Sequence, residues 1–135
     1  MAYKIIEVEG IGPAYAAKLE EAAIATTDDL LNAAATPKGR QALAEATGIS
    51  PALILKWANH ADLFRIKGVA GQFAELLEAA GVDTVKEFRH RVAANLHSKL
   101  VEINEAKHLC GRVPSEAEIQ RMIDEAKELA PVLTY

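Results

Sequence analysis

The residues best suited to chemistry near the start of the chain are Gly10 and Gly12, which flank Ile11 in the stretch GIGPAY. Paired glycines allow the backbone to turn tightly and leave the N–H groups of a following helix free of Cβ atoms. Together with the helix dipole, such N–H groups attract an anion by about 0.3–1 kcal/mol. The spacing therefore predicts a turn whose backbone suits a phosphate group.

The charged residues around this turn oppose that use. Glu7 and Glu9 precede the glycines, and the nearby cations are Lys4 and Lys18. Two carboxylates would face a polyanion such as DNA, because like charges repel. The first turn thus combines suitable backbone geometry with unsuitable charge.

An internal repeat supplies a second turn of the opposite kind. Sliding the chain by 58 positions aligns six identical pairs: Gly10/Gly68, Ala16/Ala74, Leu19/Leu77, Glu20/Glu78, Ala22/Ala80 and Thr26/Thr84. A weaker match at an offset of 65 aligns residues 50–61 with residues 115–126. The second copy carries Arg65 and Lys67 before Gly68, but Ala70 stands where the second glycine belongs. We interpret the chain as two copies of one helical unit.

Helix start signals divide each copy into short helices. Pro13, Pro37 and Pro51 suit the first position of a helix, where the missing N–H costs nothing. Capping-box spacing marks three further starts, at Thr26 with Asp29, Thr84 with Glu87 and Ser115 with Glu118. Apolar residues recur at helical spacing within residues 54–61 and 119–126, which predicts two buried faces.

These signals predict an all-α protein without strands. We expect two tandem units, residues 1–62 and 63–135, packed as one compact domain, with a short helix before the first turn. The 135 residues, half of them apolar, suffice for a buried core.

The turn residues resemble the helix-hairpin-helix motif. The matching positions are Ile5, Val8, Gly10, Ile11, Gly12, Ala16 and Leu19, and in the second copy Leu63, Ile66, Gly68, Val69, Ala74 and Leu77. The whole chain is also similar to a bacterial family known only as domain of unknown function 4332. That similarity implies a helical architecture of the SAM-like type and no activity.

The resemblance implies binding to the backbone of duplex DNA without sequence selectivity, because contacts of this type position a protein and specify no base. A non-enzymatic module that binds DNA in this way is our first hypothesis. The residues it assigns to nucleic-acid binding are Gly10, Ile11, Gly12, Lys18, Arg65, Lys67, Gly68 and Val69. It also implies, in some members, a monovalent cation held by hairpin carbonyls. No other cofactor is expected.

The charge distribution supports a different partner. The formal net charge is −4, and residues 1–35 carry two lysines against six acidic residues. Our second hypothesis is therefore a protein-interaction or assembly module, binding another protein or a second copy, whose hairpins are purely structural. A basic strip formed by Lys86, Arg89 and His90 at helical spacing is a further candidate anion surface, against the alternative of an ordinary solvated helix face.

The remaining residues do not predict an enzyme. His97, His108 and Cys110 can each bind zinc, but His108 and Cys110 lie two apart on an expected helix and point in different directions. No nucleophile or phosphate-loop motif occurs, so we expect neither catalysis nor a small-molecule substrate.

Targeting signals are also missing from the sequence. The chain has no apolar run of about 18 residues, its first residues do not resemble a signal peptide, and Cys110 is its single cysteine. We expect no membrane contact and a cytoplasmic location.

Overall fold

The first half of the chain folds into short helices that begin where the sequence predicts. The computed structural model describes residues 3–69 and 71–135. Its first half contains a 3-10 helix, η1 (Ile5–Glu7), followed by α1 (Pro13–Glu21), α2 (Thr27–Ala33), α3 (Pro37–Thr47) and α4 (Pro51–Leu63). Proline occupies the start of α1, α3 and α4, which confirms the predicted starts at these positions.

The second half is helical as well. It contains α5 (Gly71–Ala79), α6 (Val85–Phe88), α7 (Ala93–Lys107) and α8 (Glu116–Glu128). Every regular element of the described residues is a helix, so the all-α prediction is confirmed. None of these helices has the length and apolar character needed to cross a membrane.

The start of α2 carries the complete capping box predicted from Thr26 and Asp29. The Thr26 hydroxyl accepts from the Asp29 N–H at 3.1 Å, and the Asp29 carboxylate accepts from the backbone of Thr26 at 3.1 Å and of Ala25 at 3.0 Å. Hydrogen bonds from these two amides lower the pKa of Asp29.

The other two predicted capping boxes form only in part. The Thr84 and Ser115 hydroxyls each accept from the backbone N–H three residues later, at 3.2 Å. Glu118 also accepts from the Ser115 hydroxyl at 3.2 Å, and it pairs with Arg112, while Glu87 pairs with Arg91. The helix starts are therefore as predicted, with ion pairs at both glutamates.

Elements of the two halves recur at the spacings seen in the sequence. Helices α1 and α5 begin at Pro13 and Gly71, and α4 and α8 are both 13 residues long. Gly10 and Gly68 adopt φ angles of 94° and 91°, a left-handed conformation that favours glycine. The predicted boundary between residues 62 and 63 falls inside the last turn of α4.

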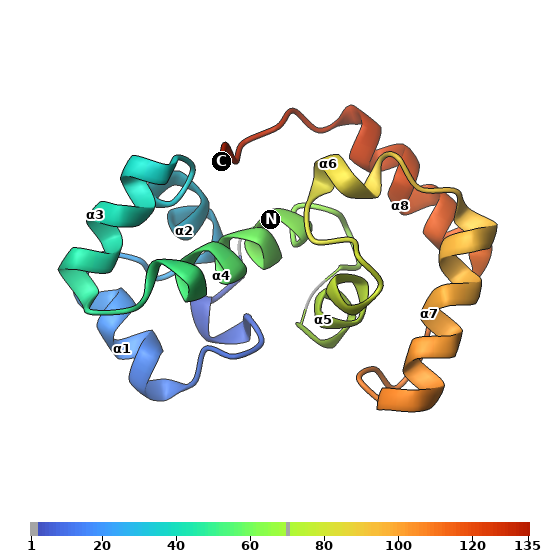
Figure 1. Ribbon diagram of the computed structural model, residues 1–135, viewed down its shortest axis with the longest axis horizontal. Coiled ribbons are helices and arrows are strands. Elements are labelled where there is room, and N and C mark those ends of the chain that lie inside the picture. The colour runs from blue at the N-terminus through green and yellow to red at the C-terminus, as the bar shows by residue number, and fades with distance from the viewer. Residues whose placement is uncertain (1–2, 70) are drawn as a thin grey trace.

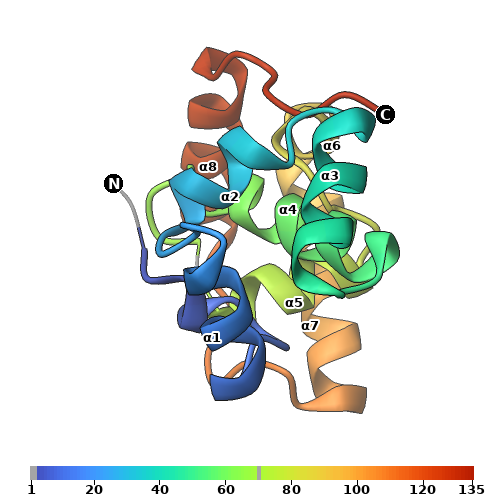
Figure 2. The same cartoon turned by 90° about the vertical axis from the view of Figure 1, so that its left-hand side faces the viewer.

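The two halves share one apolar core. Helix α4 packs against α2 and α3, α8 packs against α6 and α7, and α5 contacts both α4 and α7. In Figure 1, α1–α3 lie on one side and α5–α8 on the other, with α4 running between them. Figure 2, seen from the α1–α3 side, places α4 behind α2 and α3. The apolar faces predicted within residues 54–61 and 119–126 are confirmed, because their side chains are buried. The buried residues are Ile54, Trp57, Ala58, Ala61, Ile119, Met122, Ile123 and Ala126.

Candidate binding surface at the two glycine turns

The first turn leaves the surroundings of Gly12 open. A Cβ atom on Gly10 would lie 3.2 Å from Nε1 of Trp57, so packing and the positive φ both require glycine there. Gly12 precedes α1 with a φ of −88°, and no side chain caps the helix. A Cβ on Gly12 would meet no heavy atom within 4 Å. Close packing thus explains why position 10 is glycine, but it does not explain the glycine at position 12.

Ile11, which lies between the two glycines of the first turn, and Val69, which follows Gly68 in the second, pack into the core. The side chains of Ile11 and Val69 are 4% and 0% exposed. Their backbone N–H groups donate within the turn, from Ile11 to the Val8 carbonyl at 3.0 Å and from Val69 to the Ile66 carbonyl at 3.1 Å. Of the predicted binding residues, these two therefore pack the core and keep their amides inside the protein.

The charged side chains at the first turn are mixed in sign. Glu7 and Glu9 are exposed, and the Glu7 carboxylate accepts from the Lys4 backbone N–H at 2.9 Å. Lys18 is exposed on α1, with its Nζ 5.9 Å from the centre of the Tyr15 ring. Two ammonium groups, of Lys4 and Lys18, thus accompany two carboxylates, as the sequence indicates.

The second turn is covered by α8. The Lys67 N–H donates to both carboxylate oxygens of Glu125, at 3.2 and 3.3 Å, and the Lys67 carbonyl accepts from Nη2 of Arg121 at 3.1 Å. A Cβ on Gly68 would lie 3.3 Å from Cε of Met122 and 3.4 Å from the same arginine nitrogen. The Lys67 carbonyl therefore does not suit the monovalent cation that the resemblance implies, because a guanidinium already occupies it.

The two cations predicted for the second turn have different surroundings. Nη1 of Arg65 donates to Oδ1 of Asp62 at 2.9 Å, and its Nη2 donates to the Ala130 carbonyl at 2.7 Å. The Lys67 side chain is exposed and lines an open groove of about 500 Å³ together with Tyr3, Arg65 and Glu125. Only Lys67 is placed to meet a phosphate from solution.

The segments that carry the two turns lie side by side. The Glu7 carbonyl, just before the first turn, is 4.0 Å from the position of a Cβ on Gly71, just after the second. The rings of Tyr3 and Phe64 also meet edge to face, 5.1 Å apart. The predicted role of Ala70 in the second turn lies outside the described residues. Lys67 and Glu125 line one groove at the second turn, and Glu7 and Glu9 are exposed at the first, so charges of both signs lie around the turns.

The basic strip predicted around residues 86–90 does not form on one helix. Helix α6 ends at Phe88 and α7 begins at Ala93, so Lys86 and His90 lie on different segments. The short α6 ends there because the N–H groups of His90 and Arg91 bond to carbonyls three residues back, in place of the i→i−4 bonds of an α-helix. The prediction of one helical strip is wrong, although His90 and Lys99 line a separate hollow of about 270 Å³.

The structure does not gather the candidate zinc ligands. Helix α7 ends at Lys107, and His108 follows in the left-handed conformation with φ 53°. Cys110 therefore lies in a loop and not on a helix, which corrects that prediction. It is partly buried, and its Sγ contacts the Arg112 carbonyl at 3.2 Å. No group of three or more potential metal ligands occurs within residues 3–69 and 71–135.

Comparison with known proteins assigns the chain to a family without assigning a function. A match to the family described as Domain of unknown function (DUF4332) covers residues 9–129, and thus both turns and all eight α-helices. The chain belongs to the DUF4332 family. No curated protein and no solved structure matches the chain.

Buried polar residues of this DUF4332 chain were not predicted from the sequence. Arg40, Asn59, His60 and Asp62 are all at most 9% exposed. Arg40 lies three residues before the buried Leu43 on α3, and this helical spacing is the one feature of the sequence that indicates its burial. The partners of these polar residues come from distant parts of the chain, so spacing alone cannot identify them.

One of these residues connects the two halves of the DUF4332 fold. Nε2 of His60 lies 2.9 Å from the Glu78 carboxylate, and Nζ of Lys56 lies 3.8 Å from it. Among the described residues, Nδ1 of His60 has no hydrogen-bond partner. The His60–Glu78 contact therefore links α4 to α5.

Proposed function

We propose that this protein is a non-enzymatic assembly module that binds protein, including other copies of itself, and that its glycine turns are structural. Two tandem helix-hairpin-helix units in a cytoplasmic protein remain our interpretation of the chain. The proposal rests mainly on the second turn, where α8 occupies the backbone of Lys67 through Glu125 and Arg121. The turn with the favourable charge is therefore the one whose backbone is in use.

Charge and exposure support a protein partner. Arg65 is bonded to Asp62 and to the Ala130 carbonyl. Glu125 lies beside Lys67 at the second turn, and Glu7 is exposed at the first. A surface of mixed sign does not concentrate a polyanion, because DNA-backbone affinity comes from many cations acting together. Ile6 and Val92 are 47% and 61% exposed, and apolar side chains in such positions contribute to protein contacts.

DNA-backbone binding is the second candidate, and one observation favours it. Gly12 is open to solvent at a helix start that no side chain caps, and Lys18 and Lys67 are exposed. A single open turn with flanking carboxylates predicts weak binding that falls steeply with salt.

A salt-titrated binding assay separates the two candidates. Fluorescence anisotropy of a labelled DNA duplex is measured with the full chain at about 50 mM salt and above, the range in which backbone contacts are most visible. The assembly proposal expects no saturable DNA binding and a concentration-dependent rise in mass by sedimentation velocity. Two results together would overturn the assembly proposal. The first is saturable DNA binding that Lys67→Glu weakens more than the matched control Lys38→Glu does, and the second is a strictly monomeric chain.

A further inference from the structure

Residues 130–135, here called the strap, leave α8 and return to the other half of the molecule. Figure 1 shows this segment crossing from α8 to the side of α2 and α3. It lies in a strap groove, which we define by Ala35, Arg40, Asn59 and Arg65. These groove residues come from α3, from α4 and from the segments that follow α2 and α4.

The groove holds the strap largely through main-chain atoms. The Thr134 N–H donates to the Ala35 carbonyl at 2.8 Å, and the Thr134 carbonyl accepts from Nη2 of Arg40 at 2.8 Å. Farther along the strap, the Ala130 carbonyl accepts from Arg65 at 2.7 Å. Recognition of an extended main chain is the mode by which proteins bind peptide segments, with side-chain contacts adding specificity.

Tyr135 supplies side-chain contacts at the groove and is itself 65% exposed. Its hydroxyl donates to Oδ1 of Asn59 at 2.8 Å, and its ring centre lies 5.6 Å from the Arg40 guanidinium carbon. Asn59 and Arg40 are themselves at most 9% exposed. The groove therefore offers an aromatic residue a polar contact and a cation–π contact at its two ends.

Arg40 makes the groove dependent on an occupant. The residue is 7% exposed, and within the described part of the chain no carboxylate lies within ion-pairing distance of it. Its acceptors are the Ala34 carbonyl at 2.9 Å and the Thr134 carbonyl of the strap. A buried guanidinium needs such acceptors, since an unpaired buried donor is costly.

The strap and its groove are attached to different halves of the fold. The strap continues α8, which packs against α6 and α7, whereas Arg40 and Asn59 belong to α3 and α4. Arg40 and Arg65 also keep partners outside the strap, namely the Ala34 carbonyl and Asp62. Each of these arginines therefore keeps one partner when the strap is absent and loses the acceptor that the strap supplies.

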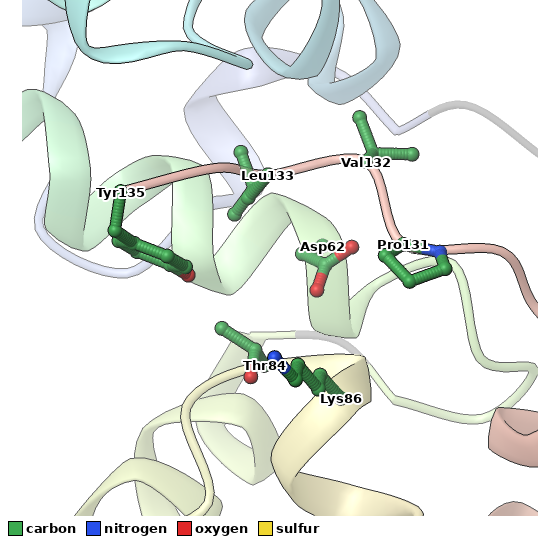
Figure 3. A pocket seen from close by; sticks show the side chains of 7 residues that line it. All are labelled: Asp62, Thr84, Lys86, Pro131, Val132, Leu133 and Tyr135. Atoms are coloured by element: carbon green, nitrogen blue, oxygen red, sulfur yellow. The ribbon is translucent and has the colours of Figure 1, made fainter.

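The strap packs against the core through two apolar side chains. Val132 and Leu133 are only partly buried. Figure 3 shows them on the strap above α4, with Asp62, Thr84 and Lys86 on the opposite wall of a small cavity of about 20 Å³. The space between strap and body is therefore lined on one side by polar side chains.

We propose that the strap groove is an interaction site for a second copy of this chain, occupied by exchange of straps between two copies. This inference rests on the proposed assembly function and names its interface. Each copy would place its strap in the groove of the other, giving a closed dimer with two equivalent contacts. The exchanged and closed forms make the same groove contacts, so protein concentration controls their balance.

Complementation between two full-length variants tests the exchange. Arg40→Met disables the groove and leaves the strap intact, whereas Thr134→Pro removes the N–H that bonds to Ala35 and leaves the groove intact. Neither variant can form a good contact within its own chain or with its own kind. A mixture can form one, between the strap of the first and the groove of the second.

Sedimentation velocity on each variant and on the equimolar mixture supplies the readout. We expect the mixture to associate at least about tenfold more strongly than either variant alone, equivalent to about 1.4 kcal/mol. The matched control Lys38→Met, on the same helix as Arg40, keeps both groove and strap and should associate as wild type does. If circular dichroism shows that Arg40→Met does not fold, Arg65→Met serves as the groove variant.

Two results would overturn strap exchange. A mixture that remains monomeric while wild type associates, or single variants that associate as strongly as wild type, would place the interface elsewhere and leave the assembly function standing. A monomeric mixture with a monomeric wild type would refute both proposals.

Discussion

Asp62 joins α4, α6 and the strap region, and its removal should cost more stability than any surface change. The residue is 4% exposed. Its Oδ2 accepts from the Val85 N–H at 2.9 Å and its Oδ1 accepts from Arg65 at 2.9 Å. Asp62→Ala therefore leaves a buried amide without an acceptor and removes the ion-pair partner of Arg65.

The magnitude follows from these two losses. An unsatisfied buried N–H costs about 1–3 kcal/mol, and a hydrogen bond to a charged group contributes about 1.5–3 kcal/mol. The Arg65 side chain is 18% exposed and keeps its hydrogen bond to the Ala130 carbonyl. The lost Asp62–Arg65 interaction therefore belongs at the low end of this range. We expect Asp62→Ala to lower the free energy of unfolding by about 3 kcal/mol, or the Tm by roughly 10 °C.

Urea denaturation followed by far-UV circular dichroism measures the change. Asp62→Asn keeps an acceptor for Val85 but loses the charge, so we expect roughly half the effect. Asp124→Asn makes the same charge change at an exposed site and should stay within about 0.5 kcal/mol of wild type. A loss below about 1 kcal/mol for Asp62→Ala, or equal losses for both Asp62 variants, would refute this reasoning.

Three further predictions concern the first turn and the titratable groups. Gly10→Ala should destabilise the protein by about 1–2 kcal/mol in urea melts, because of its positive φ and the nearby Trp57, while Gly12→Ala should be neutral or slightly stabilising. Equal effects of the two would contradict the assignment of Gly10 as the strained position. Because the pKa of Asp29 is lowered in the folded protein, its carboxylate stabilises the fold above the ordinary pKa of 3.8. This stabilisation is lost as the pH falls below that value. Asp29→Asn should therefore flatten the acid side of the stability curve, and an unchanged acid slope would refute this. Burial of the Tyr135 hydroxyl raises its pKa to about 12, and the negative charge of nearby carboxylates acts in the same direction. Arg40 acts in the opposite direction and lowers the pKa. Stability should thus be full below about pH 10 and decline towards pH 12, and Tyr135→Phe should remove that decline in alkaline melts.

The helices could be predicted because their signals are local. Proline at Pro13, Pro37 and Pro51 and the hydroxyl caps at Thr26 and Ser115 act within one helical turn of the start they define. The buried faces of α4 and α8 follow from a spacing that any 3.6-residue helix imposes. The strip predicted from Lys86 to His90 does not form on one helix, because the backbone changes to i→i−3 hydrogen bonds after Phe88.

The surroundings of the candidate site could be predicted only in part. The sequence correctly indicates two carboxylates, Glu7 and Glu9, at the first turn and two cations, Arg65 and Lys67, before the second. It does not indicate that Arg65 is engaged by Asp62 and Ala130, because the latter lies 65 residues away.

The sequence by itself determined that the chain is helical, where most helices start, and that Gly10 and Gly68 recur in equivalent places. Only the tertiary structure decided which backbone and side-chain groups remain free to bind. Helix α8 covers the second turn, the strap occupies a groove around Arg40, and Gly12 stays open. The physical reason is that helix formation depends on contacts a few residues apart, whereas access to a surface depends on which distant segments pack over it.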